Sequence, residues 1–262
     1  MFDGPSFLVW YLSTSCSLEN ANKKKMKSFS CFYLTLITQV KVVIICTSAS
    51  ELQGHPTGLW LEEAAVPYYT FRDKGFQVIL ASIKGGEIPI DKASLSGDFF
   101  VETSKKFMED EQAQSKLQNS IALKDVDFKD VDAIYLAGGH GTCVDFVGNA
   151  ELKKIIEAQY ASDKIVAADC HGPIALAECN GPDGKPIVAG KKVTGFSDSE
   201  ENGVQLTSKV PFLIEAKFKE QGANVVTGKD WTSNVCVDGK LFTGQNPQSS
   251  EALANEVANA LA

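Results

Sequence analysis

A cysteine and a histidine, Cys170 and His171, stand between an apolar segment and the pair Gly172 and Pro173. The apolar residues before Cys170 are typical of a buried strand, and proline is favoured in the first turn of a helix. A tight turn between a strand and a helix is the layout of a nucleophile elbow, which presents one reactive side chain above the edge of a sheet. We expect the amides at the start of that helix to favour the thiolate and to lower the pKa of Cys170. The sequence therefore predicts a nucleophilic cysteine, and the alternative is a small buried side chain that only fills space.

Glycines follow another expected strand, at residues 133–137, in a loop that begins Gly138-Gly139-His140. Paired glycines let backbone N–H groups point at a negative charge that develops on a substrate oxygen. Because the carboxyl ends of parallel strands meet at one edge of a sheet, we expect this loop to lie beside Cys170. Gly138 and Gly139 are therefore candidates for an oxyanion site.

Acidic residues at two further places fit the same chemistry. Glu62 and Glu63 are neighbours on an expected helix, where their side chains point about 100° apart. If one of them is buried near Cys170, desolvation raises its pKa and suits it to transfer protons. Three more acidic residues follow the expected strand at residues 193–196: Asp198, Glu200 and Glu201. One of these carboxylates is expected to orient His171, and the residues alone do not choose among them.

Strands and helices alternate along the chain from residue 41 onwards. We expect strands at residues 42–46, 76–81, 133–137, 165–168, 193–196 and 224–227, and a hairpin at the Asp238-Gly239 dipeptide. We expect helices at residues 57–74, 104–110, 150–160, 173–179, 210–221 and 249–262. This alternation predicts an α/β fold: a flavodoxin-like, doubly wound, mostly parallel sheet with helices on both faces. No repeat or long linker divides residues 41–262, so we expect them to form a single domain.

The first 40 residues differ from the rest of the chain, because two short apolar runs flank a basic cluster at residues 23–27. We interpret residues 1–40 as a leader that is disordered or belongs to a mis-assigned start of the chain. The alternative is a signal-like segment that starts at Met26. Gln39 and Lys41 interrupt the second apolar run before it reaches the roughly 20 residues of a membrane span, so no membrane span is expected.

The composition is that of a globular protein of 262 residues, with 44% hydrophobic and 22% charged residues. A net charge of −8 disfavours binding to nucleic acid. The seven cysteines are odd in number and include no C-x-x-C pair, which indicates a reducing compartment and predicts a cytoplasmic protein. With three histidines, a dedicated metal site is not expected, although His55 near Glu63 leaves a peripheral metal ion as an alternative.

The chain from Lys41 to Ala262 resembles the ThiJ/PfpI superfamily, and within it the branch of glutathione-independent glyoxalases (glyoxalase III, D-lactate dehydratase) and heat-shock chaperones. The segments that carry the resemblance are residues 57–64 (TGLWLEEA), 137–142 (AGGHGT), 170–173 (CHGP), 193–196 (VTGF) and 238–247 (DGKLFTGQNP). The resemblance implies a class I glutamine amidotransferase-like domain in which Cys170 is the nucleophile, His171 its partner and Glu201 the third member.

The same resemblance assigns further residues around the sulfur. Glu63 matches the helix carboxylate of the family, and Gly139 with the amide of His171 matches its oxyanion site. Pairing of subunits is common in the superfamily, so we expect a homodimer.

The resemblance implies conversion of methylglyoxal, a small 2-oxoaldehyde, to D-lactate in a stress response. Cys170 would add to the aldehyde carbon to give a hemithioacetal, and His171 or Glu63 would move the aldehyde proton to the neighbouring carbon. Hydrolysis of the resulting thioester releases the product. Because hydrogen moves as a proton within one molecule, no cofactor is expected.

The resemblance to this superfamily also allows three other functions: a holdase chaperone, a cysteine redox sensor and a PfpI-type peptidase. A class I glutamine amidotransferase is disfavoured, because that enzyme takes its histidine from far downstream and no histidine follows His171.

Overall fold

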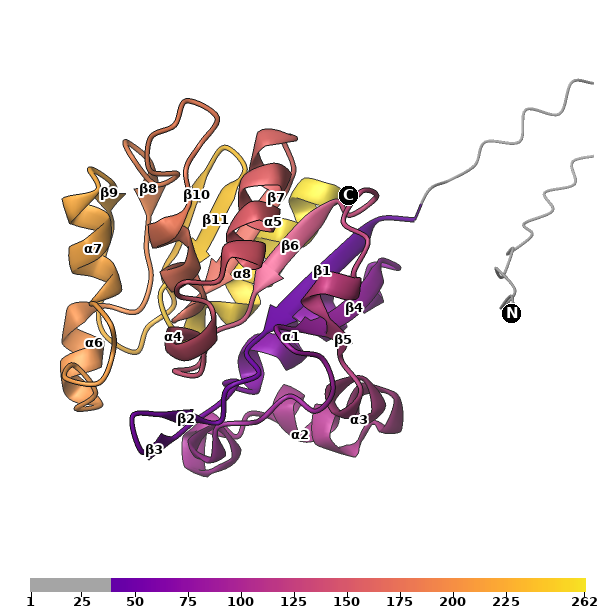
Figure 1. Ribbon diagram of the computed structural model, residues 1–262. Helices are drawn as coiled ribbons and strands as arrows, with labels where there is room; N and C mark the ends of the chain where they lie inside the picture. The colour runs from indigo at the N-terminus through magenta and orange to yellow at the C-terminus, as the bar shows by residue number, and fades with distance from the viewer. Residues whose placement is uncertain (1–38) are drawn as a thin grey trace, which may run out of the picture. The chain divides into compact units, whose positions relative to one another are not determined.

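The computed structural model describes residues 39–262, so nearly all of the leader predicted at residues 1–40 lies outside the described residues. A sheet of seven strands forms the centre of the described part (Figure 1). The strands are β1 (Lys41–Cys46), β4 (Gln77–Ser82), β5 (Ile121–Ala122), β6 (Ala133–Leu136), β7 (Ile165–Asp169), β10 (Val235–Asp238) and β11 (Leu241–Gly244). Neighbouring strands are parallel except for β10 and β11, which form the predicted hairpin.

The order of the strands in the sheet is β10-β11-β7-β6-β1-β4-β5. Without the short β5 and the antiparallel β10, the remaining five strands are arranged as 5-4-3-1-2 in chain order, which is the flavodoxin-like arrangement. The predicted α/β fold class is therefore confirmed. The order reverses between β1 and β6, and crevices outside the carboxyl ends of strands at such a reversal are where ligands bind in open α/β sheets.

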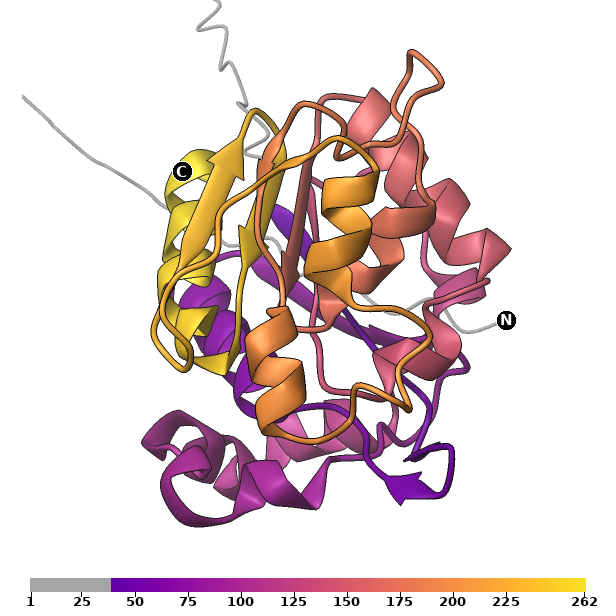
Figure 2. The same ribbon diagram turned by 90° about the vertical axis from the view of Figure 1, so that its left-hand side faces the viewer.

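Helices cover both faces of the sheet (Figure 2), because side chains alternate between the faces along each buried strand. In β1, Val42 and Ile44 pack on the face covered by α1 (Glu62–Asp73) and α8 (Ser250–Leu261). Val43 and Ile45 pack on the opposite face. That face is covered by α5 (Ala150–Ala161), α7 (Ile214–Glu220) and the 3₁₀ segment η4 (Gly172–Glu178).

Shorter elements surround this core. They are β2 (Glu51–Leu52), β3 (His55–Pro56), α2 (Glu102–Glu109), α3 (Glu111–Gln118), α4 (Thr142–Asp145), α6 (Asp198–Gly203), β8 (Lys192–Val193) and β9 (Asn224–Val225). Of the helices in residues 39–262, none combines the length and the apolar character that crossing a bilayer requires.

Several predicted elements need correction. The helix predicted from residue 57 begins at Glu62, because Gly58 lies against Pro89 and the Leu59 amide donates to the Pro89 carbonyl at 2.8 Å. The strand predicted at residues 193–196 is only the short β8, which pairs with β9 outside the main sheet. Helix α3 lies in a segment whose polar sequence predicted no element.

The close approach of η4 to β6 generates a prediction about stability. A Cβ atom added at Gly172 would lie 2.2 Å from the carbonyl oxygen of Leu136, in a central strand that cannot move aside. We expect Gly172→Ala to lower the free energy of unfolding by about 1–3 kcal/mol in urea denaturation. The control is Gly203→Ala, whose new Cβ would be 3.6 Å from the nearest heavy atom and should change stability by less than about 0.5 kcal/mol. Equal urea midpoints for the two variants would contradict the packing argument.

Candidate active site

The turn after β7 places Cys170 at the carboxyl edge of the sheet. Its φ is 55°, in the left-handed region that costs a non-glycine residue free energy. Backbone hydrogen bonds hold the residue on both sides: its amide donates to Gly244 at 3.0 Å, and its carbonyl accepts from Phe196 at 2.9 Å. The strained turn expected of a nucleophile elbow is therefore present in the backbone.

A chain of hydrogen bonds leads from the sulfur to Glu201. The Sγ atom of Cys170 lies 3.3 Å from Nδ1 of His171, and Nε2 of His171 lies 2.7 Å from Oε2 of Glu201. Burial opposes ionisation of Glu201, but the nearby His171 and His140 outweigh it and hold the pKa of this carboxyl well below its ordinary value. An ionised Glu201 accepts the proton of Nε2, so Nδ1 of His171 is left free to accept the proton of the thiol.

The other two acidic residues of the segment have different tasks. The carboxylate of Glu200 accepts from the amide and hydroxyl of Ser197, which caps α6, and from the amide of Trp231 at 2.9 Å. Among the described residues, no histidine forms a hydrogen bond with Asp198. Asp198 lies beside Glu215, whose carboxylate accepts a hydrogen bond from the Asp198 amide at 3.0 Å. Among the three candidates, Glu201 is the one whose carboxylate reaches His171.

A second imidazole, from His140, also binds Glu201, although His140 was not among the predicted site residues. Its Nε2 lies 2.8 Å from Oε1 of Glu201, and its ring centroid is 3.9 Å from that of His171. Burial, followed by the charge of His171, lowers the pKa of His140. The sequence feature that could have identified His140 is its position directly after the paired glycines, in a loop expected at the same edge of the sheet as Cys170.

The same three side chains are the group of described residues that could hold a metal ion, since their ligand atoms lie within 4.8 Å of one another. In this geometry, however, the two oxygens of Glu201 accept one hydrogen bond each from His140 and His171. Both Nε2 atoms therefore carry protons, and a metal ion would have to displace them. The metal alternative considered for His55 and Glu63 does not correspond to a cluster of ligands in residues 39–262.

Glu63, the second residue of α1, is fully buried beside the sulfur. Its Oε2 accepts from the amide of Gly138 at 2.7 Å, and its Oε1 has no hydrogen-bond partner among the described residues. Burial, reinforced by the charge of Asp169, raises the pKa of Glu63 well above the ordinary value of a carboxyl group. Burial therefore favours the protonated form of Glu63, which has a proton to offer next to Cys170. Its neighbour Glu62 is less buried, and burial and Glu251 raise its pKa to about 7.

The two glycines of the predicted oxyanion site differ. The amide of Gly138 is already used by Glu63. Gly139 lines the pocket, and its φ is 89°. Of the pair, Gly139 is therefore the residue that lies at the pocket and whose amide is not taken up by Glu63.

The pKa expected for Cys170 was wrong in direction. The side chain is 3% exposed, and burial, followed by the charges of Glu63 and Asp169, raises its pKa above the ordinary value of a thiol. The 3₁₀ segment that follows does not outweigh these effects. The sulfur therefore keeps its proton at rest, and the acceptor available to it is Nδ1 of His171.

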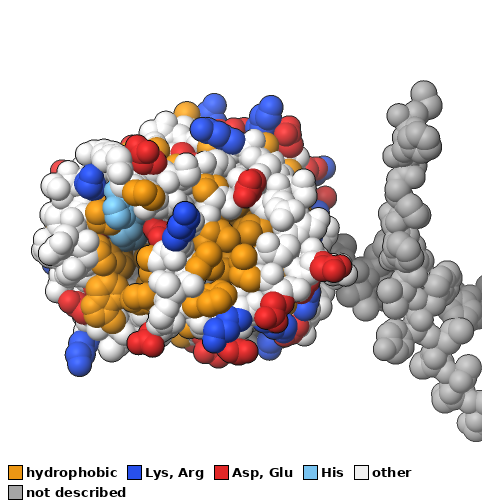
Figure 3. Space-filling model, turned by 90° about the horizontal axis from the view of Figure 1, so that it is seen from below, with side chains coloured by type: hydrophobic (Ala, Val, Ile, Leu, Met, Phe, Trp, Pro, Cys, Tyr) orange, Lys and Arg blue, Asp and Glu red, His pale blue; other side chains and the backbone are white. Residues whose placement is uncertain are grey.

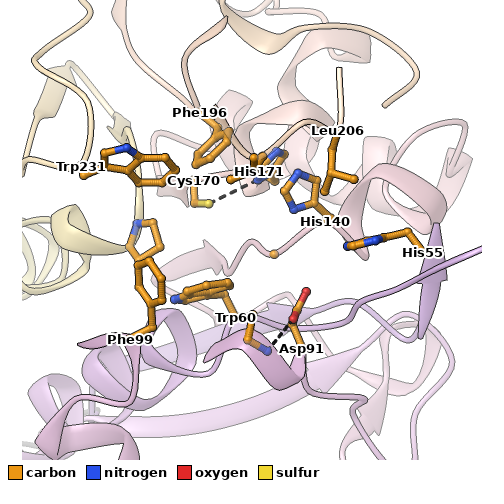
Figure 4. Close-up of a pocket in the computed structure, with 14 residues that line it drawn as sticks. His55, Trp60, Asp91, Phe99, His140, Cys170, His171, Phe196, Leu206 and Trp231 are labelled. Atoms are coloured by element: carbon orange, nitrogen blue, oxygen red, sulfur yellow. Dashed lines mark hydrogen bonds between the residues drawn. The ribbon is translucent and has the colours of Figure 1, made fainter. Parts of the chain in front are cut away.

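A pocket of about 250 Å³ opens above Cys170 (Figure 4). His140, His171 and the sulfur form one wall, and the ring of Phe196 lies 4.3 Å from the ring of His171, centroid to centroid. Figure 3 shows histidine surface next to hydrophobic side chains on this side of the molecule. The pocket has the size for a small organic molecule and brings it into contact with the thiol.

Comparison with protein-family models gives a match to the DJ-1/PfpI family over residues 57–260. Glyoxalase 3 of Candida albicans is 33% identical over 229 residues, which cover 83% of this chain and 97% of that protein. The glutathione-independent glyoxalase HSP31 of Saccharomyces cerevisiae is 33% identical over 233 residues, which cover 84% of this chain and 98% of that protein.

Solved structures give a similar result. The crystal structure of glyoxalase III from Candida albicans has a TM-score of 0.78 and 31% identity, and the match covers 85% of this chain and 98% of that one. The X-ray structure of Rapid Encystment Protein 24 kDa from Francisella tularensis has a TM-score of 0.81 and 38% identity, and covers 86% of this chain and 100% of that one.

The raised pKa of Glu63 predicts how stability depends on pH. When the pKa of a carboxyl group is higher in the folded than in the unfolded state, the folded protein loses stability as the pH rises above the unfolded-state pKa, about 4.3. Glutamine mimics the protonated side chain and has no such loss. We expect the stability of Glu63→Gln relative to the unchanged protein to rise between pH 5 and 8, by at most about 1.4 kcal/mol per pH unit.

Urea denaturation at several pH values measures this difference. The control is Glu102→Gln, at a side chain that is 92% exposed, for which the difference should be flat. A flat difference for Glu63→Gln as well would show that Glu63 is not held protonated by folding.

Proposed function

Because the chain belongs to the DJ-1/PfpI family, we propose that it is a glutathione-independent glyoxalase that converts methylglyoxal to D-lactate through a covalent adduct on Cys170. The observation that carries the proposal is the thiol at a small pocket, with a histidine that can accept its proton on one side and the buried carboxyl of Glu63 on the other. The names of the relatives from Candida albicans and Saccharomyces cerevisiae support the same chemistry.

The first step forms the bond between sulfur and substrate. The thiol of Cys170 adds to the aldehyde carbon and gives its proton to Nδ1 of His171, and Glu201 stabilises the imidazolium that results. Gly139 lines the pocket, and its amide would donate to the aldehyde oxygen, which takes up the proton of Glu63. The product of this step is a neutral hemithioacetal beside a carboxylate.

The second step moves hydrogen from one carbon to the next. The carboxylate of Glu63 removes the proton of the former aldehyde carbon, and His171 protonates the ketone oxygen to give an enediol. Glu63 then returns its proton to the neighbouring carbon while the hydroxyl of the first carbon gives its proton to His171. This leaves a lactoyl thioester on Cys170. Return of the proton to one face of the enediol sets the D configuration.

The third step restores the site. Water attacks the thioester carbon and gives a proton to Glu63, and the sulfur leaves with the proton of His171. The sum of the three steps is methylglyoxal plus water giving lactic acid. Each proton has a donor and an acceptor within the site.

Two alternatives from the same superfamily, the peptidase and the redox sensor, find less support in the site. A pocket of about 250 Å³ suits a small molecule and not an extended peptide. A thiol whose pKa is raised by burial is a poor redox sensor, because the thiolate is the form that reacts with oxidants. A cytoplasmic setting fits the five described cysteines, all of which are free.

The direct test is to incubate the purified full chain with methylglyoxal and no glutathione, and to measure lactate with chiral detection. We expect D-lactate from the unchanged protein and none from Cys170→Ala, because the thiol forms the adduct. The matched control is Cys236→Ala, at a buried cysteine of β10 that does not line the pocket, which should keep its activity. D-lactate formed at the normal rate by Cys170→Ala would overturn the covalent mechanism.

The proposed role of Glu63 in proton transfer predicts a loss of turnover when this side chain is changed. Glu63→Gln keeps the hydrogen bond from the Gly138 amide but has no proton to exchange, so we expect kcat to fall at least about 100-fold. Steady-state kinetics measure it, and binding should change less than turnover. A kcat within about threefold of normal would remove Glu63 from the proton transfer.

A further inference from the structure

The pocket above Cys170 is larger and more apolar than methylglyoxal requires. Two aromatic pairs line it in edge-to-face contact: Trp60 with Phe99, whose centroids are 5.1 Å apart, and Phe196 with Trp231, at 5.7 Å. A water molecule needs about 10–15 Å³ of such space, and the pocket offers about 250 Å³. A substrate with five non-hydrogen atoms, as in methylglyoxal, leaves most of this volume and the aromatic walls without contact.

The charged residues of the pocket disfavour an anionic ligand. Of the described residues that line it, none is lysine or arginine. Its carboxylate, Asp91, accepts from the hydroxyl of Thr57 at 2.8 Å and from the amide of Ala93 at 2.9 Å. A carboxylate or phosphate on the ligand would find no lysine or arginine and would be repelled by Asp91. The aromatic walls and the absence of these two cations from the lining therefore favour a neutral group at this part of the ligand.

The aromatic residue Trp231 is held at the pocket mouth at a cost. Its φ is 59°, and its side chain, 40% exposed, contributes little to the core. Its amide donates at 2.9 Å to Oε1 of Glu200, which also accepts from Asn246 at 2.7 Å. Phe99 on the opposite side is also 37% exposed. Exposed apolar side chains that converge on one pocket mark a ligand site, so the rings have a partner other than the protein itself.

We infer that the site is built for a neutral 2-oxoaldehyde that carries an aryl group, or an alkyl group of similar size, next to its ketone. This rests on the proposed glyoxalase function. The aldehyde carbon bonds to Cys170, and the apolar group lies between Trp60 with Phe99 and Phe196 with Trp231 (Figure 4). Methylglyoxal is then a smaller substrate of the same site.

The chemistry is unchanged for the larger substrate. With phenylglyoxal, a bond forms between Sγ of Cys170 and the aldehyde carbon, and the hydrogen of that carbon moves as a proton to the carbon that bears the ring. Water cleaves the thioester and releases mandelate and the thiol. No oxidant or reductant enters, because one carbon is oxidised as its neighbour is reduced.

The test compares kcat/KM for phenylglyoxal and methylglyoxal, with mandelate and lactate as the products measured. We expect the unchanged protein to favour phenylglyoxal at least about tenfold, because the added ring is buried among aromatic walls. In Trp231→Ala the loss for phenylglyoxal should exceed the loss for methylglyoxal by about tenfold, because one wall is removed. Arg72, the one arginine of the chain, lies outside the pocket, so reaction of phenylglyoxal with arginine leaves the site intact.

The matched control is Val237→Ala, at an exposed apolar residue of β10 that does not line the pocket, which should leave the ratio unchanged. If methylglyoxal is converted but phenylglyoxal is not favoured, or if Trp231→Ala keeps the ratio, the inference is wrong and the glyoxalase function stands. If neither compound is converted, the glyoxalase function fails and this inference fails with it.

Discussion

At the end of β7 the backbone of Cys170 turns into the left-handed region, with a φ of 55°, and the rest of the site is arranged around that turn. Such a conformation costs a non-glycine residue on the order of 1–3 kcal/mol, which the hydrogen bonds to Gly244 and Phe196 and the close packing of Gly172 on Leu136 help to offset. The turn sets the sulfur at the carboxyl edge of the sheet. Three separate segments can therefore reach the sulfur.

Two glutamates beside this turn behave in opposite ways. Glu63 is buried with one oxygen unpartnered, and its pKa rises, whereas Glu201 binds two imidazoles, and its pKa falls. One carboxyl is thus an acid and the other an anion at the same pH, which is how a site divides the tasks of proton transfer and charge stabilisation. The raised pKa of Cys170 fits this division, because the thiol gives up its proton to His171 only when a substrate is present to take the sulfur.

The sequence predicts well those features that depend on neighbouring residues. The strands are continuous apolar runs, and the elbow needs small residues next to Cys170, so both were visible without coordinates. Some features that depend on contacts between distant segments were missed. Helix α1 begins late because Gly58 packs on Pro89, and His140 joins the site through a carboxylate 61 positions away. The pKa of Cys170 was predicted in the wrong direction because burial and Glu63, from another part of the chain, outweigh the adjacent helix.

The central step of the proposed reaction is that Cys170 carries the substrate during turnover. The most direct measurement is to quench the reaction with acid in the steady state and to map the modified peptide by mass spectrometry. We expect a mass increment equal to one methylglyoxal on Cys170, and we expect hydroxylamine to remove it, as it removes a thioester. Two results would contradict a covalent role for Cys170. One is formation of D-lactate with no increment on Cys170, and the other is an increment on a different cysteine that forms as fast as the product.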